Sequence, residues 1–245
     1  MRYGIVSDIH GNLEALTKTL TFLEPRSACL IILGDVVGYG PDPVACLELL
    51  ADRGAIFVRG NHEEGFLTGD LSRFSADAKT ALVWTSQKLS PEWRKEITSW
   101  PASRELDEML IFHGSPSDPL FGYIYSPVHA KNAFPFLESA VTFHGHTHFP
   151  VAYRQKGEHG KLEVVPPDFQ GTMRVAMEEE YRYLINVGSV GQPRDGIPSA
   201  CAGIYDTDAK LFTLHRIPYP AEETKIKIEK AGLPSSLAKR LIYGA

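Results

Sequence analysis

The sequence predicts an α/β fold in which helices pack on layered sheets, and three observations support that prediction. Short runs rich in β-branched residues recur along the chain. Segments with helical periodicity separate the first three of these runs. After residue 151 strand-like runs follow one another without helices between them, so part of the later sheet is expected to be antiparallel. No repeat or linker interrupts the 245 residues, and we expect a single domain over 1–245.

Six apolar runs are predicted to be strands, and two helices are predicted to join the first three of them. The strands are Tyr3 to Ser7, Leu30 to Leu33, Ile56 to Arg59, Met109 to Phe112, Ala140 to Phe143 and Tyr183 to Val187. Helical periodicity marks Leu13 to Leu23 and Val44 to Arg53. Pro43 suits the first turn of the second helix, where its missing N–H is not needed.

The rest of the chain is predicted to hold a helical insertion, a hairpin and a helical end. Asp70 to Trp100 has helical periodicity, and Ser90 is expected to cap one of its helices. Ala202 to Tyr205 is expected to pair with Leu211 to His215 across a short turn. One or two short helices are expected over Ala221 to Tyr243.

Composition and charge argue against several classes of protein. No apolar run approaches the ~20 residues that span a bilayer, so we expect a soluble protein without a membrane partner. The net charge of −5 argues against bulk binding to nucleic acid. The chain enters a predicted strand at once, with no export signal. Its three cysteines, an odd number, suit reduced thiols, and a cytoplasmic location is expected.

Side chains of the metal-ligand type follow five of the predicted strands, at the point where each strand ends. They are Asp8 and His10, then Asp35, then Asn61 and His62, then His113, and finally His146 and His148. Because binding crevices of open α/β sheets lie beyond the carboxyl ends of the strands, these segments are expected to converge. Residues two apart in an extended segment project to the same side, so two of the segments could each present a pair of donors. The pattern predicts a metal site.

These residues resemble the calcineurin-like metallophosphoesterase superfamily, whose pattern is D-x-H, G-D, G-N-H-[DE], a lone H and G-H-x-H. The blocks stand here in that order as Asp8-x-His10, Gly34-Asp35, Gly60-Asn61-His62-Glu63, His113 and Gly145-His146-x-His148. Residues 7–12, 113–116 and 186–193 resemble its small bacterial and archaeal phosphodiesterase-like branch most. The resemblance covers most of the chain. It implies a four-layer α-β-β-α sandwich of two mixed sheets flanked by helices.

The resemblance also implies two divalent metal ions that share one carboxylate. One ion is expected on Asp8, His10, Asp35 and His148, and the other on Asp35, Asn61, His113 and His146. Such ligands, without thiolate, suit Mn²⁺, Fe, Zn²⁺, Co²⁺ or Ni²⁺, and Mn²⁺ is the usual activator in the family. A hydroxide shared by the metals would be the nucleophile. His62 resembles the general acid that protonates the leaving oxygen.

Three further side chains are candidates for substrate binding, namely Asn12, Tyr39 and Arg194. Asn12 could instead cap the following helix, Tyr39 could fill a loop, and Arg194 could pair with Asp195. Four histidines have no place in the ligand pattern. His144 is expected behind the ligands or in the packing, and His129, His159 and His215 are expected at the surface.

The leading expectation is an enzyme that hydrolyses a phosphodiester in a small phosphorylated substrate. The first alternative is a phosphomonoesterase acting on proteins, nucleotides or dinucleoside polyphosphates, because the same metal core serves all of them. A non-catalytic metal-binding scaffold is the second, and a nuclease, for which a basic stripe is missing, is the third. Selectivity is expected to lie in Gly38 to Pro43, Glu64 to Trp100 and Pro116 to Tyr125. Apolar surface on the insertion could support a homodimer.

Overall fold

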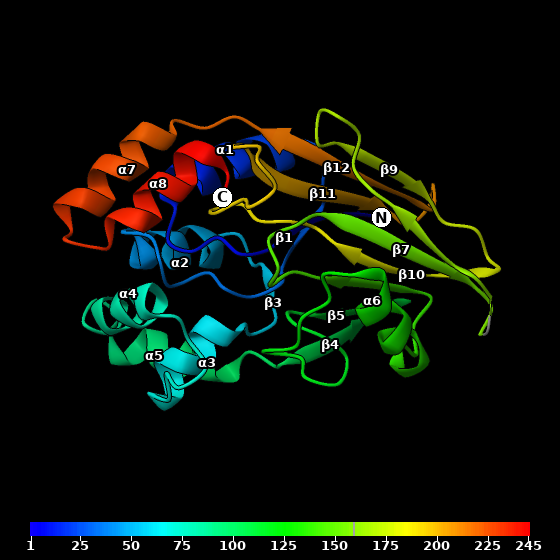
Figure 1. Ribbon diagram of the computed structural model, residues 1–245, viewed down its shortest axis with the longest axis horizontal. Helices are drawn as coiled ribbons and strands as arrows, with labels where there is room; N and C mark the ends of the chain where they lie inside the picture. Colours follow the sequence, from blue (N-terminus) through cyan, green and yellow to red (C-terminus); the bar gives the residue numbers. More distant parts are fainter. Residues whose placement is uncertain (159) are drawn as a thin grey trace.

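Two six-stranded sheets stacked face to face form the centre of the molecule, and helices cover their outer faces (Figure 1). The structure is a computed structural model that describes residues 1–158 and 160–245, so His159 lies outside the described residues. A buried cluster between the sheets contains side chains of both, among them Ile5 and Ile31 of the first and Phe143 and Ile185 of the second. The predicted α-β-β-α sandwich of two mixed sheets is confirmed.

The first sheet has the strand order β3-β2-β1-β11-β12-β9. Its strands are β1 (Arg2–Val6), β2 (Cys29–Ile32), β3 (Ile56–Phe57), β9 (Met173–Ala176), β11 (Ala200–Asp206) and β12 (Leu211–Ile217). β1, β2 and β3 are parallel, and the other neighbours are antiparallel. The predicted pairing within the β11–β12 hairpin is confirmed, with Ala202 opposite His215. The third strand is shorter than predicted because the Arg59 N–H donates to the Pro101 carbonyl outside the sheet.

The second sheet has the strand order β4-β5-β6-β10-β7-β8. Its strands are β4 (Ser103–Leu106), β5 (Met109–Phe112), β6 (Val141–His144), β7 (Val151–Lys156), β8 (Leu162–Val165) and β10 (Tyr181–Asn186). β5, β6 and β10 are parallel, and the remaining pairs are antiparallel. β4 has no counterpart among the predicted strands. Its sequence is mostly polar and exposed, and its pairing with β5 at the sheet edge, rather than an apolar pattern, makes it a strand.

The outer layers are built by helices with one apolar face each. α1 (Leu13–Leu23) and α2 (Pro43–Ala51) pack on the first sheet, where Leu16 and Leu47 join the cluster that contains Ile32. α6 (Pro127–Ala133) and the following 3₁₀ turn (Phe134–Phe136) pack on the second sheet, where Phe134 contacts the cluster of Phe112 and Leu184. These helices complete the four layers.

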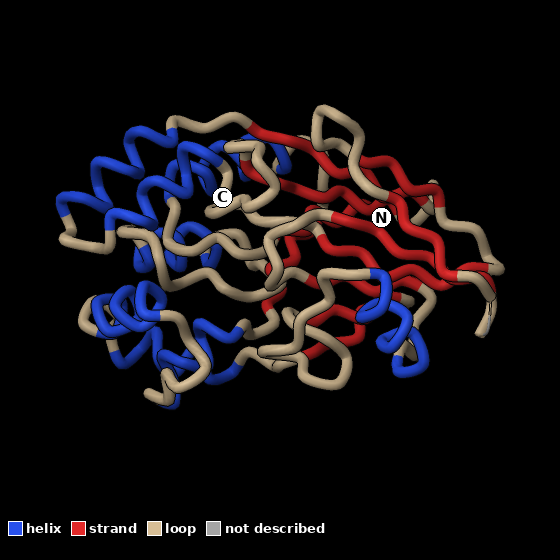
Figure 2. The backbone as a smooth tube through the Cα atoms, viewed as in Figure 1, coloured by secondary structure: helices blue, strands red, loops and turns tan. Residues whose placement is uncertain are grey.

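The remaining helices gather at one end of the sheets, as the blue and red segments of Figure 2 show. α3 (Asn61–Thr68), α4 (Ala76–Ser86) and α5 (Pro91–Ser99) form the insertion, and α7 (Ala221–Lys230) and α8 (Ser235–Tyr243) end the chain. Ser90 caps α5 as predicted, since its hydroxyl accepts from the Trp93 N–H. Within the described part of the chain, no helix is both long and apolar enough to cross a membrane.

Candidate metal centre

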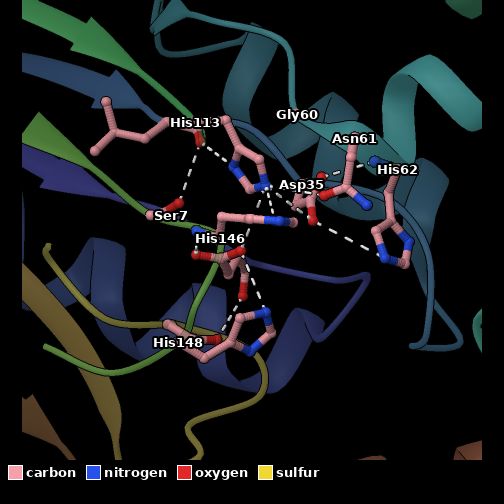
Figure 3. Close-up of polar contacts among 12 residues, drawn as sticks. Ser7, Asp35, Gly60, Asn61, His62, His113, His146 and His148 are labelled. Carbon is pink, nitrogen blue, oxygen red and sulfur yellow. Dashed lines mark hydrogen bonds and ion pairs between the residues drawn. The ribbon is translucent and has the colours of Figure 1, made fainter. Parts of the chain in front are cut away.

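The eight side chains of the predicted ligand blocks come together in loops that follow β1, β2, β3, β5 and β6. All eight are buried. Figure 3 shows His62, His113, His146 and His148 directed toward the region of the Asp35 carboxylate. The loops belong to both sheets, so the site lies where the carboxyl ends of strands from the two sheets meet.

One group of potential ligands consists of Asp8, His10 and His148. The His148 Nε2 lies 3.3 Å from Asp8 Oδ1 and 3.2 Å from His10 Nε2, and the His10 Nε2 lies 3.9 Å from Asp8 Oδ1. Ligands that each stand ~2.0–2.2 Å from one metal ion are separated by distances of this order. The three atoms are therefore spaced as ligands of one metal ion.

A second group consists of Asp35, His113 and His146, to which Asn61 adds an amide oxygen. The His113 Nε2 lies 3.3 Å from Asp35 Oδ2, 3.0 Å from His146 Nδ1 and 3.1 Å from Asn61 Oδ1. Asp35 Oδ2 is also 3.6 Å from the His10 Nε2 of the first group. Asp35 thus lies between the two groups.

Backbone carbonyls orient three of the histidines from behind. The Nδ1 atoms of His10, His113 and His148 lie 3.1, 2.7 and 2.6 Å from the carbonyl oxygens of Val37, Leu33 and Gln192, respectively. Donation from Nδ1 places the lone pair on Nε2, the atom that faces the other ligands. This is the usual support of a metal-binding histidine.

The charges and unsatisfied atoms of the cluster fit a divalent cation. Asp8 Oδ1 is buried and has no hydrogen-bond partner among the described residues. Burial would raise the pKa of Asp8, but His148 and His113 outweigh it and hold that pKa below its usual range. Burial would likewise lower the pKa of His113, yet the carboxylates of Asp35 and Asp8 raise it to about 9. The cluster therefore favours a positive charge at its centre, which a metal ion would supply.

The backbone at the ligands corrects one detail of the sequence prediction. Asp8, His10, Asp35, His146 and His148 all have φ between 50° and 67°, so none of them continues an extended strand. Such left-handed conformations are uncommon for residues other than glycine and concentrate at functional sites. The turn that they produce sends His146 and His148 to different groups rather than to one side.

Two glycines permit the close packing around these loops. A Cβ on Gly60 would lie 2.2 Å from Asp35 Oδ1, and one on Gly38 would lie 2.0 Å from His62 Nδ1. Gly38 also has a φ of +84°, which disfavours other residues. Glycine at these positions is required by the approach of the Asp35 and His62 side chains.

His62 lies at the edge of the cluster, beside the candidate ligands. Its Nε2 is 4.0 Å from Asp35 Oδ2, and its backbone N–H donates to Asp35 Oδ1. The ring packs against Tyr39, Phe74 and His10, and burial there lowers its pKa to about 4 although the Asp35 carboxylate acts in the opposite direction. Together with His10 and Asp35 it forms a third group at ligand distance, so the structure allows His62 to bind metal as well.

A cavity of about 250 Å³ opens onto the cluster and is the candidate substrate pocket. All three segments expected to set selectivity contribute to its wall, through Tyr39, Phe74 and Tyr123 among others. Arg194 also lines it. The alternative in which Arg194 pairs with Asp195 is wrong, because Asp195 pairs with Arg216 instead. Arg194 donates to Gln192 Oε1, and its Nε is buried without a partner among the described residues.

Asn12 and His144 are buried near the cluster but belong to none of its ligand groups. Asn12 Oδ1 accepts from the Ala15 N–H and caps α1, and its Nδ2 donates to the Gly191 carbonyl. Asn12 does not line the cavity. His144 is fully buried at the end of β6, outside the ligand groups, as expected. His129 and His215 are partly exposed.

Two supporting residues were not singled out from the sequence. Asn186, at the end of β10, donates to the Gly145 carbonyl and to Thr147 Oγ1, and so holds the loop that carries His146 and His148. Glu63 is fully buried and accepts from the backbone N–H groups of Asp35, Val37 and Gly60 at 2.8, 3.1 and 2.8 Å. The sequence offered a signal for each of them, because Glu63 is the last residue of the G-N-H-[DE] block and Asn186 begins the segment 186–193 that resembles the family.

Glu63→Gln is expected to weaken metal binding and lower stability, although the two side chains have the same shape. Both carboxylate oxygens accept backbone N–H bonds, so one amide N–H₂ must face a backbone donor. A buried unsatisfied donor costs ~1–3 kcal/mol of unfolding free energy. Loss of such support typically reduces metal affinity by ~10–100-fold. Denaturant titration and metal titration would measure the two effects.

Glu64→Gln provides the matched control for that substitution. Glu64 is the next residue, and its carboxylate forms a partly exposed ion pair with Arg59 at 3.0 Å. Such pairs contribute ~0–1 kcal/mol. Glu64 belongs to none of the ligand groups that the described residues form. Equal metal affinity in the wild type and Glu63→Gln would show that Glu63 does not position Asp35.

Comparison with known proteins places these features in a family. The family model for calcineurin-like phosphoesterases matches residues 1–150. An uncharacterized protein of Methanocaldococcus jannaschii is 34% identical over 98% of this chain and 97% of its own length. The crystal structure of a metallophosphoesterase from Sphaerobacter thermophilus is 37% identical with a TM-score of 0.87, covering 100% of this chain and 99% of its own. Phosphodiesterase YfcE of Escherichia coli is 25% identical over 85% of this chain and 89% of its own length.

Proposed function

This chain belongs to the calcineurin-like phosphoesterase family, and we propose that within this family of phosphoester hydrolases it is a phosphodiesterase with two divalent metal ions. The observation that carries the proposal is the position of Asp35 between two groups of ligand atoms. The similarity to phosphodiesterase YfcE supports the choice of a diester. The family uses divalent metals, and Mn²⁺ is the first candidate, followed by Fe, Zn²⁺, Ni²⁺ and Co²⁺.

In this proposal the protein holds the metals through the two groups and positions the substrate beside them. The first set is Asp8, His10, Asp35 and His148, and the second is Asp35, Asn61, His113 and His146. Two divalent ions at such a site lower the pKa of a shared water and neutralise charge on the phosphoryl oxygens. The backbone carbonyls behind three of the histidines keep the ligand atoms facing inward, so that little reorganisation is needed.

Two side chains beside the ligands would act on the substrate directly. Arg194 lines the cavity with a buried Nε that has no partner among the described residues, and we assign it to a non-bridging oxygen of the scissile phosphate. His62 would donate a proton to the leaving oxygen. Its pKa of about 4 reflects burial, and an anionic phosphate bound next to the ring would raise that pKa. Tyr39 packs against both His10 and His62 and would keep water from their rings.

The size and charge of the site favour a small phosphorylated substrate over a macromolecule. A cavity of about 250 Å³ is near the lower end of sites that take small molecules. The net charge of −5 gives long nucleic acid no general attraction. A cytoplasmic location and a homodimer formed through the insertion complete the proposal.

Paired chromogenic substrates test the proposed function. Bis(p-nitrophenyl) phosphate and p-nitrophenyl phosphate share one leaving group and differ in whether the phosphorus carries a second ester. We expect the protein with added Mn²⁺ to prefer the diester, and we expect a chelator to abolish the reaction. A higher kcat/KM for the monoester would replace the proposal with a phosphomonoesterase. Metal binding without cleavage of either compound would instead favour the non-catalytic scaffold.

A further inference from the structure

Three arginines from separate parts of the chain line the cavity that opens onto the metal centre. Arg73 precedes α4, Arg194 follows β10, and Arg240 belongs to α8. Among the described residues that line this cavity, Asp35 is the one carboxylate. The cavity wall is therefore strongly cationic in a protein whose net charge is −5.

This positive charge exceeds what the scissile phosphate requires. On the proposed function, two divalent ions contribute about +4, which the carboxylates of Asp8 and Asp35 and a shared hydroxide reduce to about +1. A phosphodiester carries a single negative charge. Arg194 is already held beside the ligands, because it donates to the Gln192 side chain, and the Gln192 carbonyl contacts His148. The scissile phosphate therefore leaves Arg73 and Arg240 without a role in binding it.

The two remaining arginines are available for a ligand. Arg73 lies 3.2 Å from Asp118, but the two side chains are 56% and 40% exposed, so the pair is weak and easily exchanged. The guanidinium of Arg73 also lies 4.1 Å above the Phe121 ring, which holds it over the cavity. Within the described part of the chain, Arg240 has no carboxylate within 4.0 Å.

The helices α4 and α8, which position these two arginines, pack against each other. Ala81 and Leu82 of α4 join Leu237 and Leu241 of α8 in one buried cluster. The Ser236 hydroxyl donates to Asp77 Oδ2 at 2.6 Å and links the same two helices. Arg73 and Arg240 thus come from elements that are fixed to each other, which reduces the entropy lost when a ligand binds.

We propose that Arg73 and Arg240 bind a second phosphate of the substrate, one that is not hydrolysed. This inference rests on the proposed function, because it places that group in the same cavity as the scissile phosphate. A guanidinium group can donate two parallel N–H bonds to two oxygens of one phosphate, so two arginines in one cavity form a suitable phosphate site. The substrate class is then a small phosphodiester that carries a further phosphate.

Two nucleotides that differ by one phosphate test the proposal. Thymidine 5′-(p-nitrophenyl phosphate) and its 3′-phosphorylated form contain the same scissile diester and leaving group. We expect the wild type with Mn²⁺ to show at least about tenfold higher kcat/KM for the 3′-phosphorylated form, equivalent to ~1.4 kcal/mol. In the double variant Arg73→Gln/Arg240→Gln the ratio of the two values should fall to near one. The ratio cancels any loss common to both substrates.

Lys239→Gln provides the matched control, since it removes an exposed positive charge from the same helix outside the cavity. It should leave the ratio unchanged. Arg240→Lys, which keeps the charge without the paired donors, should retain part of the preference. A wild-type ratio near one, or the same ratio in the wild type and the double variant, would overturn the proposal.

Calorimetry separates a failure of this inference from a failure of the proposed function. Thymidine 3′,5′-bisphosphate and thymidine 5′-monophosphate would be titrated into the Mn²⁺-loaded wild type and the double variant. Tighter binding of the bisphosphate than of the monophosphate, seen in the wild type and not in the double variant, supports the second-phosphate site. If neither diester is cleaved in that case, only the phosphodiesterase activity is rejected. Equal affinities reject the site whether or not the diesters are cleaved.

Discussion

Asp35→Asn is expected to lower kcat/KM by at least about 10³-fold and to reduce bound metal from the two proposed ions to at most one. This loss exceeds the ~10–100-fold loss of activity that is typical when a residue supporting a metal ligand is removed. Asp35 Oδ2 lies 3.3 Å from the His113 Nε2 of one ligand group and 3.6 Å from the His10 Nε2 of the other. A carboxylate can donate electron pairs to two cations and offset part of their repulsion. An amide in that position has no charge and one metal-binding atom fewer.

Asparagine isolates the charge of Asp35 because it preserves the other contacts of the side chain. Asp35 Oδ1 accepts from the His62 backbone N–H at 2.9 Å, and an amide oxygen can accept the same bond. The loop that carries Asn61 and His62 should therefore keep its place, and the effect can be attributed to the proposed bridge between the metals.

Metal content by elemental analysis and steady-state kinetics with bis(p-nitrophenyl) phosphate would measure the effect of Asp35→Asn. Asp70→Asn is a suitable control, because Asp70 is exposed on the insertion and lies outside the ligand groups. It should retain the metal content and activity of the wild type. Two bound ions in Asp35→Asn together with a less than tenfold loss of kcat/KM would show that Asp35 does not bridge.

The parts of this molecule that could be predicted from the sequence are those encoded locally. Each ligand block follows directly on a strand, so the order of the blocks and the strand pattern together indicated that Asp8, Asp35 and His113 would meet. The start of α5 at Ser90 and the pairing of β11 with β12 depend on a few neighbouring residues as well. Such features need no knowledge of distant contacts.

The parts that could not be predicted depend on contacts between distant segments. Arg240 reaches the cavity only because α8 packs against α4, more than 150 positions earlier in the chain, and nothing near Arg240 in the sequence indicates this. Asn186 supports the loop of His146 through bonds that span about 40 positions. The separation of His146 from His148 follows from left-handed backbone, which the pattern of residue types does not reveal.

His62→Ala is expected to reduce the rate by ~10²–10⁴-fold for diesters with poor leaving groups and much less for p-nitrophenyl esters. A general acid matters in proportion to the negative charge that would otherwise develop on the leaving oxygen, and p-nitrophenolate carries that charge well without a proton. The comparison therefore needs phenyl and p-nitrophenyl diesters of the same alcohol. His129→Ala, at a partly exposed histidine of α6, is the control and should affect both substrates equally little.

Metal content of the same variant decides between the two roles that the geometry allows for His62. Its Nε2 lies 4.0 Å from Asp35 Oδ2, and His62 forms a ligand-distance group with His10 and Asp35. A proton donor can be removed without loss of metal, because Asp8, His148 and the second group remain intact. Two retained ions and a selective loss for the phenyl diester would assign His62 to proton donation. Loss of an ion, or equal losses for both diesters, would make His62 a ligand or a structural neighbour of the metals instead.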